Sequence, residues 1–425
     1  MWTRGFIVLW IAMLVAMAGI GMVSPLLPIY VRDDLGGPEI AVALSFSGLA
    51  LAQLVASPFV GRLGDYIGTK PFIVTGFLIY CLGAVGYLFA DSWQLVIAFR
   101  MITGFGAASV FPMTLAYIGR LAPPGREGSF MGTFSVSQIL GFGVGPLLGG
   151  TIRDAFGSET AFLTMAIMLG ATGLATLLLL PPDQGERDTG EGTQEARLPL
   201  LEVVKLPLVQ AAISIQLLVA LGFGASFSFL AIFVISEEGL GTGSAMFVGI
   251  LFGARSIIGA MMQPIAGRAA DRYNRVVLVV AAFSISALGQ FLIPSVPRDL
   301  VETSFFGTAL VVAPWLLALM VGVGLAEAFA MPASQAIFVS VGRSVGMGSV
   351  MGLNQMGGAI GFLSGSLIGA AVVSNFGIDA VFRYAGIVSF LGAFVFLLLM
   401  RRAAAELREA ESLPAPEASP GIARS

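Results

Sequence analysis

Long apolar stretches alternate with short polar breaks along this chain. A transmembrane helix needs roughly 20 predominantly apolar residues, and the sequence offers twelve stretches of about that length. The predicted spans are residues 5–30, 39–60, 71–90, 93–118, 129–152, 160–181, 207–235, 244–266, 276–295, 309–340, 345–373 and 380–400. The first stretch is too long for the apolar region of a signal peptide, so we predict that it is a span. The pattern therefore predicts an all-α membrane protein with 12 transmembrane helices.

The last six spans repeat the first six. Gly61 and Asp65 recur 206 residues later as Gly267 and Asp271. Further along the offset becomes 220, and residues 128–132 (GSFMG) match residues 348–352 (GSVMG). The additional residues fall between spans nine and ten, around residues 297–308, where we expect a longer outer loop. Parallel repeats of six helices, with the substrate path between them, are one known transporter design.

The repeat predicts two pseudo-symmetric six-helix bundles, at residues 1–181 and 207–400. Residues 182–206 form the one long polar segment inside the chain, so we predict that they are a cytoplasmic linker. Residues 401–425 are rich in Ala, Glu and Pro and are predicted to be a cytoplasmic tail, a frayed helix followed by disorder.

The composition agrees with burial in lipid. Hydrophobic residues make up 57% of the chain, charged residues 11%, and the mean hydropathy is +0.92, more apolar side chain than a water-soluble fold can hide. The single cysteine, Cys81, cannot form an internal disulfide, and histidine is absent. We therefore expect no metal site and no cofactor.

The cations indicate the orientation. Most of the 22 Lys and Arg residues flank the termini or the even-numbered breaks between spans. Only four lie at the opposite side by this placement: Arg32, Arg153, Arg298 and Arg383. Because Lys and Arg are enriched in cytoplasmic segments, we predict a multi-pass protein of the cell membrane with both termini in the cytoplasm.

A short charged loop follows span two, at residues 61–70 (GRLGDYIGTK). It resembles the signature GxLaDRxGRK of the major facilitator superfamily, although Tyr66 and Thr69 stand where that family usually has arginines. A second copy lies at residues 267–275 (GRAADRYNR). Its carboxylate can cap the N–H groups of the next helix and bridge to cations of a neighbouring helix, forming a latch that breaks when the halves rock. The alternative is an ordinary charged turn. The predicted gating residues are Gly61, Asp65, Gly68, Lys70, Gly267, Asp271, Arg272 and Arg275.

Two further motifs carry the same resemblance. Residues 100–108 (RMITGFGAA) are similar to the family pattern RxxqGxgaa, which implies that Arg100 takes part in proton coupling. Arg100 lies about 10 Å inside the outer face, so it must face protein or a water-filled cavity unless it snorkels outward. Residues 141–150 (GFGVGPLLGG) match the antiporter signature GxxxGPxxGG in full, which implies export by exchange. Its residues Gly141, Gly145, Pro146, Gly149 and Gly150 are expected to let this span pack tightly against its partner in the other half.

Arg255 and Glu327 are the other two ionisable residues well inside spans. Both lie about 18–20 Å from the cytoplasmic end of their helix, near the bilayer midplane. In the fold that the resemblance implies, spans eight and ten share a bundle, so we predict that the two side chains meet. Desolvation favours the neutral form of a buried carboxyl group, whereas a guanidinium favours the carboxylate, and this competition can make a proton switch. A permanent structural ion pair is the alternative.

The resemblance also implies that spans one, four, seven and ten line a central cavity. Phe and Met with few polar anchors suit bulky amphipathic cargo better than a sugar. The candidate wall residues are Tyr30, Met113, Tyr117, Gln216, Phe223, Phe227, Met331, Gln335, Asn354 and Gln355.

These features favour a secondary active transporter similar to the drug:proton antiporter branch of the superfamily. We expect proton-coupled efflux of small amphipathic or cationic compounds by alternating access. The alternatives are a uniporter or symporter of a small metabolite such as a sugar or organic acid, or a membrane sensor that keeps the fold. An enzyme is the poorest fit, because the sequence shows no nucleophile–base set and no phosphate loop. The expected partners are a small-molecule substrate, protons and the lipid bilayer, with no nucleic acid, and we expect a monomer.

Overall fold

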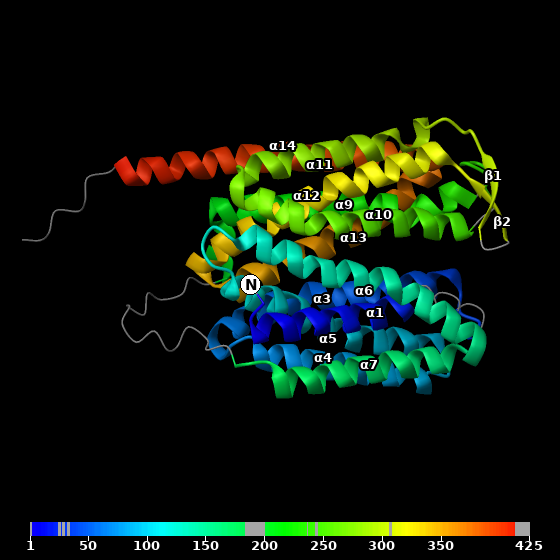
Figure 1. The fold of residues 1–425 in the computed structure, drawn as a ribbon, viewed down its shortest axis with the longest axis horizontal. Helices are drawn as coiled ribbons and strands as arrows, with labels where there is room; N and C mark the ends of the chain where they lie inside the picture. Colours follow the sequence, from blue (N-terminus) through cyan, green and yellow to red (C-terminus); the bar gives the residue numbers. More distant parts are fainter. Residues whose placement is uncertain are drawn as a thin grey trace, which may run out of the picture.

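The computed structural model describes most of the chain. The described residues are 2–23, 27, 30–31, 35–182, 200–235, 237–242, 245–305 and 308–412. Within them the chain is almost entirely helical (Figure 1). Helices are expected in lipid, because a helix satisfies its own backbone hydrogen bonds where no water is available.

Two groups of long helices lie side by side, one from each half of the sequence (Figure 1). The N-terminal half contains α1 (Arg4–Val23), α3 (Glu39–Ile67), α4 (Lys70–Gly86), α5 (Trp93–Leu121), α6 (Glu127–Phe156) and α7 (Ser158–Leu179). The C-terminal half contains α9 (Pro207–Ile235), α10 (Ala245–Arg272), α11 (Arg275–Leu292), α12 (Pro314–Val345), α13 (Met347–Phe376) and α14 (Ile378–Ser412). The short elements are η2 (Tyr87–Phe89), α8 (Leu200–Lys205), η4 (Ile293–Ser295), β1 (Val301–Phe305) and β2 (Thr308–Val312). The halves meet where α3 packs on α13 and α6 packs on α10.

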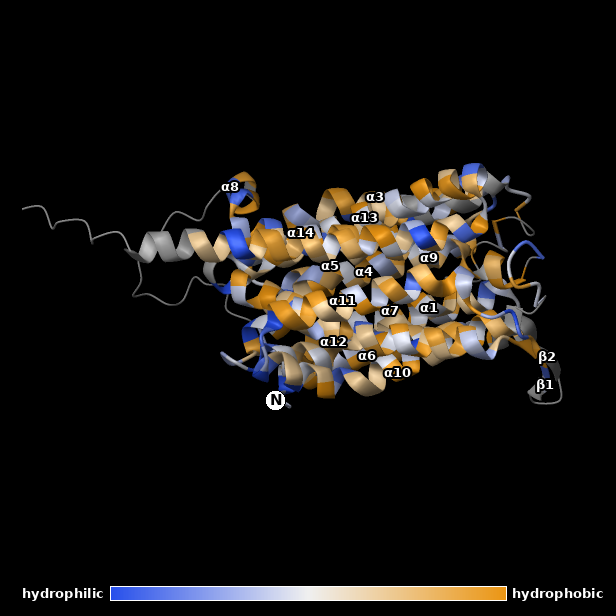
Figure 2. Cartoon of the chain, turned by 90° about the horizontal axis from the view of Figure 1, so that it is seen from above, coloured by the Kyte–Doolittle hydropathy of each residue, from blue (hydrophilic) through white to orange (hydrophobic). Residues whose placement is uncertain are grey.

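The outer surface of the bundle is apolar. In the described part of the chain, ten helices are long and apolar enough to cross a membrane by length and composition, namely α1, α4, α5, α7 and α9 to α14. The other two long helices, α3 and α6, contain 29 and 30 residues and lie among them. Large apolar side chains point outward, and Leu178 and Leu367 are 67% and 64% exposed. Figure 2 shows hydrophilic segments mainly toward the two ends of the bundle. A surface of this kind fits a lipid surrounding.

The two ends of the bundle differ. The N-terminus and the end of α14 lie at one end, here called the termini side, and strands β1 and β2 lie at the opposite end, the hairpin side (Figure 1). The strands pair antiparallel, with Val301 opposite Val312. Their hairpin replaces the plain loop expected between spans nine and ten, and the prediction that span ten begins at residue 309 is wrong. Residues 309–312 are apolar but rich in valine, which favours a strand, and Pro314 suits the first turn of a helix.

The ends of the predicted domains are partly described. Helix α14 continues through Ser412, so the first part of the predicted tail is helical. Within the predicted linker, α8 forms a short helix. The rest of the linker, residues 183–199, and the rest of the tail, residues 413–425, lie outside the described residues.

Glycines of the antiporter signature bring α6 against α1. A Cβ atom on Gly145 would lie 2.5 Å from the carbonyl oxygen of Ala18, and Gly141 and Gly149 face the α1 backbone in the same way. Pro146 and Gly150 also lie within α6. The prediction that this motif packs against the other half is therefore wrong. Positions four residues apart share one helix face, and here that face meets α1 of the same half.

The C-terminal half repeats this packing without the proline. Gly361 and Gly365, the counterparts of Gly141 and Gly145, press against the backbone of α9 at Leu217 and Leu221. The closely packed pair α1 with α6 thus has its counterpart in α9 with α13. Small residues are what allow backbones to approach this closely in membrane proteins.

We expect Gly145→Ala to lower the free energy of unfolding by about 1–3 kcal/mol, the usual cost of overpacking. The added methyl group would collide with the α1 backbone, which cannot move aside as a flexible side chain can. Thermal unfolding of the purified protein in detergent measures the effect. Gly143→Ala is the matched control, because nothing lies within 4 Å of a Cβ atom there. Equal losses in the two variants would contradict the assigned packing.

Candidate functional site

A partly buried ion pair joins α10 to α12. The Arg255 Nε donates to Glu327 Oε2 at 3.0 Å, and Nη2 donates to Oε1 at 2.6 Å and to Oε2 at 2.7 Å. The side chains of Arg255 and Glu327 are 12% and 23% exposed. The structure thus brings together the two residues that were expected to meet. A two-pronged pair of this kind is among the strongest and most directional polar contacts in proteins.

Close packing of the two helices makes this contact possible. A Cβ atom on Gly324 would lie 2.7 Å from the carbonyl oxygen of Arg255 and 3.0 Å from its Cγ. Gly324 stands three residues before Glu327, on the same side of α12. A larger residue at this position would push the helices apart and lengthen the ion pair.

Two further groups contact the pair. Ser286 of α11 donates its hydroxyl to Glu327 Oε1 at 3.1 Å. The Cζ of Arg255 lies 5.2 Å from the ring centroid of Phe223 of α9, within the range of a cation–π contact. Four transmembrane helices therefore converge on one carboxylate and one guanidinium.

An aromatic group, here called the phenylalanine cluster, adjoins the pair. It consists of Phe223, Phe227, Phe252 and Phe362, from α9, α10 and α13. The ring centroids of Phe223 and Phe227 are 5.2 Å apart, and those of Phe227 and Phe252 are 5.0 Å apart. Sequence reasoning named Phe223 and Phe227 but missed Phe252, Phe362 and Ser286. The combination of flat apolar rings and one polar pair can bind an aromatic amphipathic compound.

The other predicted wall residues of the C-terminal half lie on three helices. Met331 and Gln335 follow Glu327 at intervals of four residues, so all three share one face of α12, and Met331 is 45% exposed. Gln216 of α9 lies beside Gly358 of α13. The remaining two lie on α13, where Asn354 is buried and Gln355 is half-buried.

Three predicted wall residues are held in contacts within the N-terminal half. Met113 is fully buried and packs over Gly64 of α3. Tyr30 donates its hydroxyl to the carbonyl oxygen of Ala90 at 3.0 Å, and its ring centroid lies 4.9 Å from that of Phe162. The sequence contained no information on which neighbour each of them would face.

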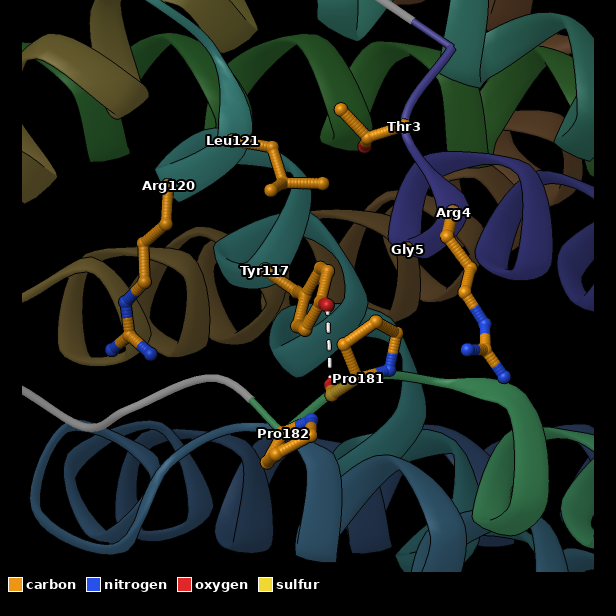
Figure 3. A pocket seen from close by; sticks show the side chains of 8 residues that line it. All are labelled: Thr3, Arg4, Gly5, Tyr117, Arg120, Leu121, Pro181 and Pro182. Carbon is orange, nitrogen blue, oxygen red and sulfur yellow. Dashed lines mark hydrogen bonds between the residues drawn. The ribbon is translucent and has the colours of Figure 1, made fainter.

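Tyr117 is the third of these residues. It borders a pocket of about 420 Å³ at the termini side, together with Arg4, Arg120 and Pro181 (Figure 3). Its hydroxyl donates to the carbonyl oxygen of Pro181 at 3.2 Å. Tyr117 thus contacts the chain segment that leaves α7.

Arg100 lies in the other half from the ion pair. It is 4% exposed, and its Nε donates to the backbone oxygen of Ser45 on α3 at 3.2 Å. The expectation that this buried cation faces protein and finds acceptors is met, but its role in proton coupling stays a prediction.

The first latch joins α3 to the beginning of α13. Asp65, 1% exposed, accepts hydrogen bonds from the amides of Gly348 at 2.6 Å and Ser349 at 2.7 Å, and from the Ser349 hydroxyl at 2.7 Å. Arg120 pairs with the same carboxylate at 3.1 Å. The prediction that this carboxylate caps the next helix is wrong, because it caps a helix of the other half. Negative charge is favourable at that end, where the amides have no partner within the helix.

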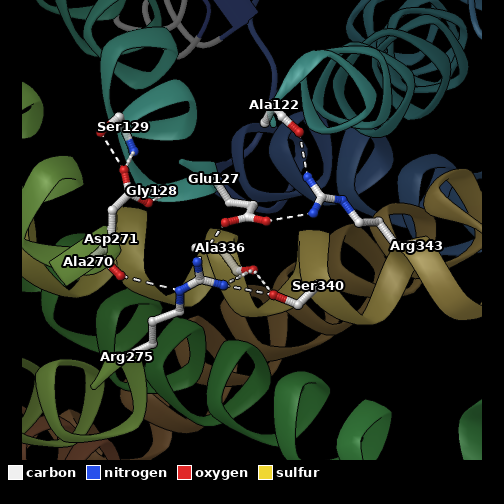
Figure 4. A network of polar contacts seen from close by, with 10 residues as sticks. All are labelled: Ala122, Glu127, Gly128, Ser129, Ala270, Asp271, Arg275, Ala336, Ser340 and Arg343. Carbon is white, nitrogen blue, oxygen red and sulfur yellow. Dashed lines mark hydrogen bonds and ion pairs between the residues drawn. The ribbon is translucent and has the colours of Figure 1, made fainter. Parts of the chain in front are cut away.

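A second latch repeats the first from the other direction. Asp271 of α10 accepts hydrogen bonds from the amides of Gly128 at 2.8 Å and Ser129 at 3.0 Å, at the beginning of α6, and from the Ser129 hydroxyl (Figure 4). Each half thus contributes one carboxylate and one helix N-terminus. Together the two latches hold the halves against each other at the termini side.

An ion network beside the second latch joins the halves again. Glu127 of α6 binds Arg275 of α11 at 2.6 Å and Arg343 of α12 at 2.7 Å (Figure 4). Arg275 also donates to the Ser340 hydroxyl at 2.8 Å, and Arg343 to the carbonyl oxygen of Ala122. Sequence reasoning named Arg275 but not its partner.

The pKa of Glu127 is lowered, although burial, the largest single influence, acts to raise it. The opposing influences are its own backbone N–H, the hydrogen bond and charge of Arg275, and the charge of Arg343. Glu127 precedes the predicted span 129–152, so it lies outside the membrane interior. The carboxylate form is therefore the stable one at neutral pH.

The remaining predicted gating residues are spread around these contacts. Gly61 packs against Gly348, and Gly267 packs against Gly128, so small residues stand at both crossings of the halves. The other three are Gly68, which ends α3 with a φ of 97°, Lys70, whose Nζ donates to the carbonyl oxygen of Leu180 at 2.5 Å, and Arg272, which is exposed.

Known proteins share the sequence pattern and the fold of this chain. The sequence profile of the Major Facilitator Superfamily matches residues 9–301 and 244–423. The chain belongs to this superfamily. It is therefore a multi-pass membrane transporter.

Relatives extend over nearly the whole chain. A multidrug resistance protein MdtG of Enterobacter lignolyticus is 27% identical over 425 residues, which cover 98% of this chain and 97% of the relative. An MFS-type transporter of Methanocaldococcus jannaschii is 24% identical over 409 residues, covering 94% and 99%. The solved structure of the human organic anion transporter MFSD10 (TETRAN) aligns with a TM-score of 0.72 at 19% identity, covering 92% of this chain and 99% of that one. That likeness concerns the fold.

We expect Asp65→Asn to let the halves separate more often at the termini side. A neutral amide oxygen binds the α13 amides more weakly than a carboxylate does, by about 1–2 kcal/mol. Spin labels at Pro124→Cys and Tyr273→Cys, both exposed, in a Cys81→Ser background would report the change as longer distances.

Asp91→Asn is the matched control, because this exposed aspartate lies at the beginning of α5, away from the latch. Unchanged distances in Asp65→Asn would show that this latch does not hold the halves together.

The lowered pKa of Glu127 gives its network a defined pH dependence. The carboxylate stabilises the joined halves above about 4.5, its ordinary pKa, and the contribution is lost as the pH falls through the lowered pKa. The contribution of this network to the spin-label distances should therefore stay constant between pH 5 and pH 8 and be lost only in more acidic buffer. In Glu127→Gln the distances should be longer at every pH, and wild-type distances in this variant would contradict this assignment.

Proposed function

We propose that this transporter exports small amphipathic compounds in exchange for protons, by alternating access. The Arg255–Glu327 pair beside the phenylalanine cluster is the observation that carries this proposal. A titratable carboxylate and an aromatic binding surface share one location, so proton binding and cargo binding can influence each other there.

The proposed exchange uses the charge of Glu327. While the carboxylate is ionised, it holds Arg255 in the two-pronged pair, and cargo packs on the rings beside them. A proton from water binds a carboxylate oxygen and removes the negative charge that holds the guanidinium. Arg255 then shifts its position on Phe223, and the cargo loses the surface on which it rested. Loss of the proton to the other side of the membrane restores the pair.

In this scheme the forming and breaking of the two latches closes and opens the transporter at the termini side. Asp65 and Asp271 join the halves at the termini side, so we propose that the described conformation is the one closed at that side. With the termini in the cytoplasm, as the distribution of Lys and Arg favours, this is the conformation that releases cargo outward. Breaking both latches would open the path to the cytoplasm. We propose that one monomer performs the full cycle.

The names of the relatives support a drug-like cargo. Several relatives that match over the length of the chain are called multidrug resistance proteins. The solved structure with the same fold belongs to an organic anion transporter, so cargo of either charge belongs in the test.

Transport into proteoliposomes tests the proposal directly. The panel contains lipophilic cations, neutral aromatic drugs and aromatic carboxylates, each with and without an imposed pH gradient. Accumulation of an amphipathic compound against its gradient only when protons flow the opposite way supports proton-driven exchange. Counterflow that ignores the pH gradient would instead indicate a uniporter, and accumulation along with protons a symporter.

We expect Glu327→Gln to abolish proton-driven accumulation, because glutamine keeps the shape of glutamate but cannot take up a proton at neutral pH. Because glutamine, like the protonated acid, carries no negative charge to hold Arg255, cargo should also bind more weakly in this variant. Glu302→Gln, on the exposed strand β1, is the matched control. Full accumulation by Glu327→Gln would eliminate Glu327 as the coupling group.

A further inference from the structure

Glu327 has a hydrogen-bond partner on α11 in addition to its arginine. Its Oε2 accepts from Arg255 Nε and Nη2, while its Oε1 accepts from Arg255 Nη2 and from the Ser286 hydroxyl at 3.1 Å. Ser286 is 2% exposed, so its hydroxyl is shielded from water. A buried hydroxyl that donates to a carboxylate stabilises the charged form of the acid.

We infer that Ser286 is a positioning residue, which holds the Glu327 carboxylate against the Arg255 guanidinium and sets the pH at which the transporter takes up its proton. The inference rests on the proposed coupling role of Glu327. It assigns a function to the interior of α11, where the sequence analysis named no residue beyond Arg275 at the beginning of the helix.

The charged groups that surround Glu327 are few. From α10 the guanidinium of Arg255 faces it, and the sequences of α9 and α13 contain no titratable residue. On α11 the one titratable residue is Arg275, which binds Glu127 at the termini side. From the N-terminal half, α5 and α6 approach α12. Their titratable residues in the described interior and at the ends are Arg100, Tyr117, Arg120, Glu127, Arg153 and Asp154.

The N-terminal groups whose contacts are described are engaged elsewhere. Arg100 donates to Ser45, Arg120 binds Asp65, and Glu127 binds Arg275 and Arg343. Among the described contacts, Arg255 is the one cation that binds Glu327, so each neutral donor to this carboxylate matters. Removing one donor should therefore be visible in its titration.

A hydroxyl can do what the guanidinium cannot. Arg255 only donates hydrogen bonds, so once the acid is neutral it loses the ionic attraction and can keep only a weaker hydrogen bond to the carbonyl oxygen. Ser286 donates to the carboxylate and can turn its hydroxyl to accept a hydrogen bond from the protonated acid. It can therefore keep the Glu327 side chain attached to α11 in both states, while Arg255 is held less strongly.

The test compares Ser286→Ala with a second buried serine. Ser226 of α9 is 5% exposed and donates to Gln290 Oε1 at 3.1 Å, without touching the ion pair, so Ser226→Ala removes a similar hydrogen bond elsewhere. Ser286→Thr keeps the hydroxyl. We expect the midpoint of the pH profile of proton-driven transport to rise by about one pH unit in Ser286→Ala, because the charged acid loses a donor. Ser226→Ala and Ser286→Thr should keep the wild-type midpoint.

A second readout separates this inference from the proposed function. The infrared band of a protonated carboxyl group, assigned to Glu327 by its loss in Glu327→Gln, can be titrated in the purified protein without any transport. The inference is supported if the band titrates in the wild type and the midpoint of this titration lies at higher pH in Ser286→Ala. A band that titrates identically in Ser286→Ala and Ser226→Ala overturns it. A wild-type transporter with no pH-gradient dependence would overturn the coupling role itself, whatever Ser286 does.

Discussion

Unpaired backbone amides at two helix N-termini require acceptors, and each half of this transporter finds them in a carboxylate of the other half. Asp65 accepts from the beginning of α13, and Asp271 accepts from the beginning of α6. In both cases the acceptor belongs to the opposite half from the helix that it caps. Neither half therefore satisfies the N-terminal amides of α6 and α13 alone. The duplication of the sequence thus has a direct physical result, a reciprocal exchange of two hydrogen-bonded charges.

The ionisable side chains inside the helices differ between the two halves, although the folds of the halves are nearly symmetric. The ion pair with its serine and its phenylalanine cluster lies in the C-terminal half, on α9 to α13. The N-terminal half contains a different buried cation, Arg100, bound to the backbone of α3. Symmetry supplies the mechanical framework, whereas the proposed proton chemistry uses Arg255 and Glu327, which stand where the first repeat has Leu49 and Ala107.

Sequence reasoning predicted the helices and the repeat, because apolar length is a local property. It predicted the meeting of Arg255 with Glu327 from their similar depth by helical rise, together with the family resemblance, which implies that spans eight and ten share a bundle. It did not predict which neighbour a given face meets. The partner of Asp65, the packing of Gly145 and the burial of Met113 all depend on the rotation and crossing of separate helices. Phe252 stands three residues before Arg255 on the same helix face, a signal that could have been used. Ser286 offered none, since a serine within an apolar span is ordinary.

The two contacts of α6 limit how this protein can move. Near its beginning, Gly128 and Gly132 touch α10 of the opposite half, while Gly145 and its neighbours lie against the α1 backbone. The contact with α1 is made by glycines against backbone. The contact with α10 includes the Asp271 carboxylate, whose hydrogen bonds to α6 can break. In the proposed alternation, α1 and α6 would therefore move together as one rigid unit, and the halves would slide at the glycine crossing of α6 and α10. A displacement of this unit at the hairpin side would then be transmitted to the contact between Asp271 and the beginning of α6.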